Sequence, residues 1–131
     1  MRVIPLRLDP GTDLKQALQM VVRKEALTAA WLMSCVGSLR QITFRLADVL
    51  VAEGEYEIIS GAGTLSSTGM HVHLCVADQT GAMIGGHLLG GCLVSSSGTV
   101  EVILGVDDNW QFARSAHAET GYDELSISRT A

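Results

Sequence analysis

The chain has 131 residues and a formal net charge of −5 at pH 7, and 47% of its residues are hydrophobic. This length and composition predict a single globular domain, residues 1–131, with a sizeable core. No apolar run approaches the roughly 18 residues that a membrane-spanning helix needs, so we expect no membrane segment. The nine Lys and Arg residues are scattered, which argues against DNA binding by the chain unaided, because such affinity comes mainly from clustered cations.

Three widely spaced cysteines, Cys35, Cys75 and Cys92, lie in apolar surroundings. They form neither a CxxC pair nor the even-numbered framework of a disulfide-stabilised protein. The apolar stretch in residues 1–9 is too short and too interrupted for a secretory signal. We therefore expect reduced thiols and a cytoplasmic protein.

The N-terminal part predicts one strand followed by one helix. Residues 3–8 favour a strand that ends at the turn signal Asp9-Pro10-Gly11. Asp13 is then placed to cap a helix, with Gln16 at the capping-box distance, and the helix is expected to run to about Ala26. The apolar residues that recur at helical spacing are Leu14, Ala17, Leu18, Val21 and Val22.

The rest of the chain predicts strands. We expect extended segments at residues 28–36, 39–47, 55–65, 70–78, 83–90, 92–94 and 99–106. Gly37-Ser38 is expected to separate the first of these strands from the second. The strand pattern weakens after Asp107. We expect Trp110–Phe112 to pack at a sheet or subunit edge and a polar tail to follow Glu119. The fold class is α+β: a mainly antiparallel sheet with one major helix packed on a face. So much sheet and so little helix favours oligomerisation to cover apolar surface.

The most informative segment is the predicted hairpin, which holds three of the four histidines. His71 and His73 are two residues apart and point to one face of a strand, opposite an apolar stripe. The position of His87 depends on register. A four-residue connection would place it opposite Val72, on the wrong face, whereas a three- or five-residue connection, or a bulge, would place it opposite His71. Both alternatives stay open.

Three imidazoles on one face would match a zinc site with an open fourth position. The competing interpretation is that exposed hairpin histidines simply contact water, and a His-x-His pattern alone is weak. Cys75 is expected to point to the same face of the strand as His71 and His73, but a lone thiol at such a position is more often a small packing residue. Dinucleotide and phosphate-loop patterns are incomplete, because Gly61-Ala62-Gly63 lacks a third glycine and a following helix.

Several stretches in order resemble the PPC (plant and prokaryote conserved) domain: residues 34–39 (SCVGSL), 54–65 (GEYEIISGAGTL), 71–81 (HVHLCVADQTG), 85–94 (GGHLLGGCLV) and 99–104 (TVEVIL). The resemblance covers about residues 3–106 and leaves 107–131 as a weakly assigned C-terminal segment. It implies a sheet-plus-helix fold that assembles as a homotrimer and contacts other proteins. No AT-hook is present, which agrees with the acidic charge in arguing against direct DNA binding.

The resemblance also implies that His71, His73 and His87 are ligands of zinc or another divalent metal, because prokaryotic members carry histidines at these positions. Three functions are considered. The favoured one is a trimeric interaction module, associated with transcription and DNA through its family. The alternative is a metal-dependent enzyme of unknown substrate in which Glu57 or Glu101 is the general base. A small-molecule sensor at subunit junctions is a third, supported only by glycine-rich loops.

Overall fold

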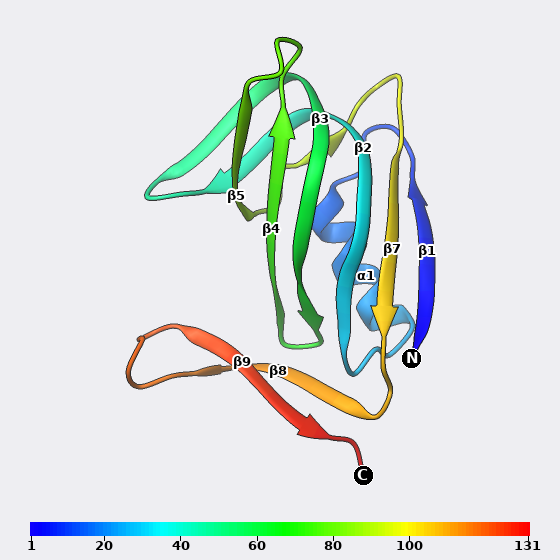
Figure 1. Ribbon diagram of the computed structural model, residues 1–131, viewed down its shortest axis with the longest axis vertical. Helices are drawn as coiled ribbons and strands as arrows, with labels where there is room; N and C mark the ends of the chain where they lie inside the picture. Colours follow the sequence, from blue (N-terminus) through cyan, green and yellow to red (C-terminus); the bar gives the residue numbers. More distant parts are fainter.

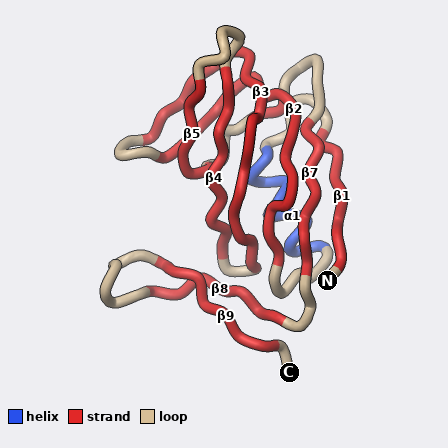
Figure 2. The backbone as a smooth tube through the Cα atoms, viewed as in Figure 1, coloured by secondary structure: helices blue, strands red, loops and turns tan.

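A computed structural model describes residues 1–131 and contains one helix, a seven-stranded sheet and a separate two-stranded sheet (Figures 1 and 2). The elements are β1 (Arg2–Leu8), α1 (Leu14–Lys24), β2 (Ala30–Arg45), β3 (Val49–Ser66), β4 (Gly69–Ala77), β5 (Met83–Leu88), β6 (Leu93–Val94), β7 (Val100–Val106), β8 (Trp110–Ala116) and β9 (Asp123–Arg129). The large sheet has the order β1-β7-β2-β3-β4-β5, and its pairings are antiparallel. The predicted fold class, a mainly antiparallel sheet with one helix, is confirmed.

The helix begins as the sequence predicts. The side chain of Asp13 accepts a hydrogen bond from the Gln16 amide at 3.1 Å, and its other carboxylate oxygen accepts one from the Gly91 amide at 2.8 Å. The helix ends at Lys24, two residues earlier than expected, because Ala26 adopts a left-handed conformation with φ +50°. α1 is too short and insufficiently apolar to cross a bilayer.

The core lies between α1 and the sheet. The buried face of α1 carries Leu14, Leu18 and Val22, and these belong to a single cluster of 23 buried residues that includes side chains from β2, β3, β4 and β7. Burial of this contiguous apolar surface is the main stabilising contribution to the fold.

Two of the predicted strands are in fact one. β2 runs without interruption through Gly37, where a break was expected. Gly37 has φ +138°, and a Cβ atom there would lie 2.8 Å from the Val100 Cα. The glycine therefore permits close approach of β7 rather than ending the strand, and β2 bends through register shifts at Leu32/Ser34 and Leu39/Gln41.

The far end of β2 closes a circuit of four strands. β2 pairs with β3, β3 with β4, and β4 with β5. β5 then pairs back onto β2 through Phe44↔Leu88 and Arg45↔His87. This closure brings the last residue of β2 beside the third histidine.

The C-terminal region is a hairpin rather than the expected polar tail. β8 and β9 pair with Phe112 opposite Ile127, and the Arg129 guanidinium lies 4.3 Å from the centroid of the Trp110 ring. The Phe112 amide donates to the Thr28 carbonyl at 2.8 Å, which ties this hairpin to the main domain. In Figures 1 and 2 the hairpin runs across one end of the sheet, next to the β3–β4 turn.

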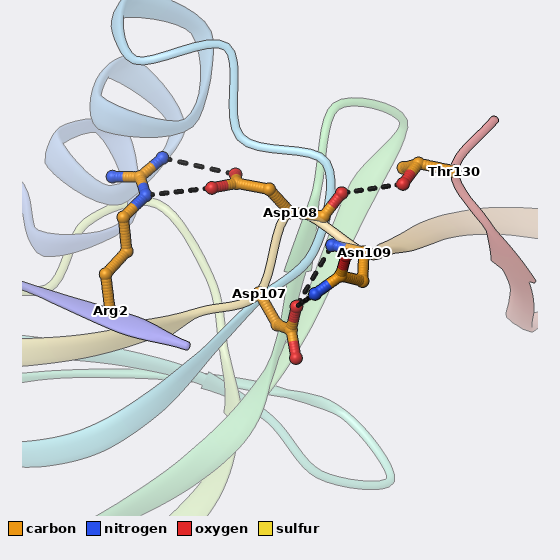
Figure 3. Close-up of polar contacts among 5 residues, drawn as sticks. All are labelled: Arg2, Asp107, Asp108, Asn109 and Thr130. Atoms are coloured by element: carbon orange, nitrogen blue, oxygen red, sulfur yellow. Dashed lines mark hydrogen bonds and ion pairs between the residues drawn. The ribbon is translucent and has the colours of Figure 1, made fainter.

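A polar turn fixes the base of the C-terminal hairpin (Figure 3). Arg2 forms an ion pair with Asp108 at 3.1 Å, and this contact is the main cause that lowers the pKa of the Asp108 carboxyl. The Asp107 carboxylate accepts hydrogen bonds from the amide and side chain of Asn109, and the Thr130 hydroxyl donates to the Asp108 carbonyl at 2.7 Å. The two ends of the chain are thereby joined to one turn.

Candidate metal centre

The register of the β4–β5 hairpin decides where His87 lies. Ala77 pairs with Met83 across a five-residue connection, and His73 consequently pairs with His87. A five-residue connection was expected to place His87 opposite His71, and this is wrong by two residues, although His73 lies on the same face as His71. The same pairing also removes the alternative that places His87 opposite Val72, on the wrong face.

The side chain of Asp78 stabilises this connection, together with backbone hydrogen bonds from the Asp78 amide to the Ala82 carbonyl and from the Gly81 amide to the Asp78 carbonyl. The Asp78 carboxylate accepts hydrogen bonds from the Thr80 amide (2.8 Å), the Thr80 hydroxyl (2.6 Å) and the Ala82 amide (3.0 Å). These bonds stabilise the ionised form and lower the pKa of Asp78, the Thr80 hydroxyl contributing most. Gly81 supplies the left-handed position, with φ +86°.

The structure brings His71, His73 and His87 together. The Nε2 atoms of His71 and His73 are 3.0 Å apart, and one ligand atom from each of the three histidines lies within 4.8 Å of the others. Ring centroids are separated by 4.7 Å (His71–His73), 4.9 Å (His71–His87) and 4.3 Å (His73–His87). Nitrogen ligands of a tetrahedral zinc ion lie about 3.3 Å from one another, so this donor set fits a zinc-like ion with small adjustments.

The surroundings of His71 and His87 favour the neutral form of these two rings. Burial, followed by the charge of His73, lowers the pKa of His71, and burial, followed by the charge of Arg45, lowers the pKa of His87. The Arg45 guanidinium donates to the His87 Nδ1 at 3.3 Å. Because a metal binds the neutral imidazole, these surroundings suit coordination better than they suit protonation.

Two cavities adjoin the histidines. The first, about 550 Å³, lies over β2–β5 and is lined by Arg45, His73 and His87 among others. The second, about 580 Å³, is bounded by His71 and His87 on one side and by the C-terminal hairpin on the other. Both are within the usual size range of small-molecule sites.

The C-terminal hairpin contributes residues that the sequence did not point to. Arg114, Tyr122, Asp123 and Glu124 line the second cavity, and the Arg114 guanidinium donates to the Thr64 hydroxyl at 2.7 Å. Glu124 also acts electrostatically on His71. The only signal for this hairpin in the sequence was the short alternation of Leu125 and Ile127 with serines.

Other candidate residues lie elsewhere. Glu57 and Glu101, expected as possible general bases, line neither cavity beside the histidines. Cys75 is partly exposed and lines the first cavity, but the ligand cluster consists of the histidines alone. Burial raises the pKa of the Cys35 thiol to about 12 and that of Cys92 to about 11, so these two are packing residues.

The amino-acid sequence matches a known family and part of a known protein. Residues 1–107 match the Plants and Prokaryotes Conserved (PCC) domain. The whole chain is 44% identical, over 135 residues, to the "Bifunctional protein GlmU" of Synechococcus sp. (strain JA-3-3Ab). It spans only 21% of the length of that protein, so the similarity concerns one part of it.

Solved structures share the fold. A hypothetical protein from Salmonella enterica is 40% identical, with a TM-score of 0.95 over 99% of this chain and 95% of that one. A "Putative DNA-binding protein" from Ralstonia eutropha is 23% identical (TM-score 0.82, 95% and 90% covered), and a metal-containing protein from Archaeoglobus fulgidus is 22% identical (0.74, 96% and 94%). For the Ralstonia and Archaeoglobus proteins, the similarity shows a shared fold only. With its match over residues 1–107, the chain belongs to the Plants and Prokaryotes Conserved domain family, as its motifs predicted.

Proposed function

We propose that this chain is a metal-binding PCC module in which His71, His73 and His87 hold a divalent ion, with zinc the best fit. The observation that carries the proposal is the convergence of three imidazoles whose ligand atoms lie within 4.8 Å of one another. The Archaeoglobus relative with the same fold is called metal-containing, which supports it. When bound, such an ion supplies a Lewis-acid centre with one open position.

The protein's own residues set the properties of this site. Two histidines come from β4 and the third from β5, so main-chain pairing holds all three donors. Sites built on strands keep their ligands in place better than sites on loops do. The contact of the Arg45 guanidinium with Nδ1 of His87 belongs to the metal-free ring. A guanidinium only donates, so this contact would be released if either nitrogen of the neutral His87 ring held a metal.

Replacement of His87 by alanine is expected to abolish stoichiometric metal binding. A site reduced to two imidazoles should bind zinc at least about 100-fold more weakly, because losing a ligand costs more affinity than losing a group that only orients a ligand. The measurement is zinc content by mass spectrometry after purification without chelator, followed by competition with a chromogenic chelator. His117→Ala is the matched control, because His117 is exposed and lies in the β8–β9 connection, outside the cluster. A wild-type protein that takes up no metal after reconstitution would contradict the proposal.

We also propose that the module assembles as a homotrimer. The family resemblance supports this state, and so do large apolar side chains that β2 and β3 leave exposed: Met33, Val36, Val49, Val51 and Ile59. Light scattering coupled to gel filtration should give three times the 13.9 kDa chain mass. A single-chain mass at micromolar concentration would show that these side chains are ordinary surface residues.

A second candidate function, a metal-dependent enzyme, is favoured by the cavity of about 580 Å³ between the histidines and the C-terminal hairpin. Glu124, which lines the second cavity together with His71, replaces Glu57 and Glu101 as the candidate general base. The module alone predicts no turnover that depends on His87, whereas the enzyme predicts turnover that the His87→Ala variant loses. Direct DNA binding is not included in the proposal, because the net charge is −5 and the cations are dispersed.

A further inference from the structure

The cavity of about 550 Å³ has a floor of small side chains. The register of β3, β4 and β5 places Ala62 opposite His73, Ser60 opposite Cys75, and Cys75 opposite Gly85. All of these residues lie on the face that bears the histidines. Four neighbouring positions on three strands therefore carry nothing larger than a thiol. The space this leaves next to His73 and His87 is open to a small molecule.

One guanidinium dominates the charge of this cavity. Arg45 is the only Arg or Lys among the 11 lining residues, and none of them is acidic. Arg45 is exposed and forms no ion pair, since the ion pairs of the chain are Arg2–Asp108 and Arg7–Asp9. Its contact with His87 leaves most of its five N–H donors free.

The pairing of β2 with β5 holds this cation in place. Arg45 lies opposite His87, at the last position of β2, and the next residue, Leu46, adds an apolar wall to the cavity. The second cavity contains Arg114 as well as Arg45, but Asp123 and Glu124 also line it, and these two carboxylates offset the two cations. An anion is therefore better accommodated over the small side chains than beside the C-terminal hairpin.

We propose that this cavity binds a small organic monocarboxylate, with Arg45 as the specificity-determining residue. The planar fork of a guanidinium matches a carboxylate in a bidentate arrangement. In the metal-free protein the single cation suits a single negative charge better than a phosphate dianion, and Leu46 suits a short apolar tail. This inference rests on the proposed function in so far as the carboxylate would lie beside the metal-binding histidines.

Calorimetric titration of the full chain with butyrate tests the proposal, with butyramide as the uncharged isostere and inorganic phosphate as the competing anion. Each is titrated into zinc-loaded and chelator-treated protein. Butyrate should bind at least ten times more tightly than butyramide or phosphate. Arg45→Gln should remove that preference while leaving zinc content and the unfolding midpoint unchanged. Arg40→Gln is the matched control, because Arg40 is exposed on the same strand and lines neither cavity.

The outcomes separate this inference from the metal proposal. Arg45-dependent butyrate binding to chelator-treated protein supports the inference even when zinc fails to load. Zinc loading without butyrate binding at millimolar concentrations overturns the inference and leaves the metal site intact. Equal loss of butyrate binding in the Arg45→Gln and Arg40→Gln variants, or tighter binding of phosphate, also overturns it.

Discussion

Alanine at Gly63 is expected to destabilise the protein by roughly 3–5 kcal/mol, through a left-handed backbone and a direct clash. Gly63 lies on β3 opposite Val72, between the two histidines of β4, and has φ +156°. A Cβ atom there would overlap the His71 carbonyl oxygen and lie 2.6 Å from the Val72 Cα. Since both contacts are with backbone, β4 would have to move. Equilibrium urea unfolding, followed by circular dichroism, gives the change in free energy.

Gly121→Ala is the control for Gly63→Ala. Gly121 is also left-handed, with φ +74°, but no atom lies within 4 Å of the position of its missing Cβ. Only the backbone preference is lost there, so a cost of about 1 kcal/mol is expected. Similar unfolding midpoints for the two variants would show that β3 and β4 can separate without penalty. Failure of the Gly63 variant to fold, with the Gly121 variant folded, agrees with the prediction.

Phe44→Ala is expected to cost about 3–5 kcal/mol, the range found when a large buried aromatic side chain is removed. Phe44 is fully buried and pairs with both Leu50 of β3 and Leu88 of β5. Its loss leaves a cavity where the four-strand circuit closes, next to Arg45 and His87. Because a domain of this size is stable by only about 5–15 kcal/mol, the change should appear as a large drop in the thermal midpoint.

The comparison for Phe44→Ala is Met20→Ala on the outer face of α1. Met20 is 61% exposed, and alanine is at least as good a helix former, so we expect a change within about 0.5 kcal/mol. A small effect at Phe44 would mean that the closing pairs of β2 and β5 contribute little to stability. In that case the position of Arg45 beside His87 would not depend on the core.

Local patterns in the sequence predicted local structure well. The helix followed from Asp13, Gln16 and the apolar spacing after them, because capping and helical periodicity involve residues close in the chain. The histidine pair on β4 followed from strand parity in the same way. The break expected at Gly37 was wrong, because the glycine serves a close approach to β7 that only the assembled sheet reveals.

Features that depend on distant residues could not be predicted. The register that places His87 opposite His73 depends on the Asp78 turn, whose length the alternation of side chains does not specify. Arg45 lies 42 residues from His87 in the chain, and only the closure of β5 onto β2 brings them together. The C-terminal hairpin has short strands in which apolar and polar residues alternate only weakly. Nothing in the sequence clearly indicated that this hairpin lines the cavity beside His71.

The pairing of β5 with β2 also limits how the sheet can grow. An open sheet offers unpaired N–H and C=O groups at each end, and such ends recruit further strands and promote aggregation. Here one end is folded back onto β2 at Phe44↔Leu88 and Arg45↔His87. The other end is β1, which carries Pro5, without an N–H donor, between the charges of Arg2 and Arg7. Strand-by-strand polymerisation is therefore disfavoured at both ends of this sheet.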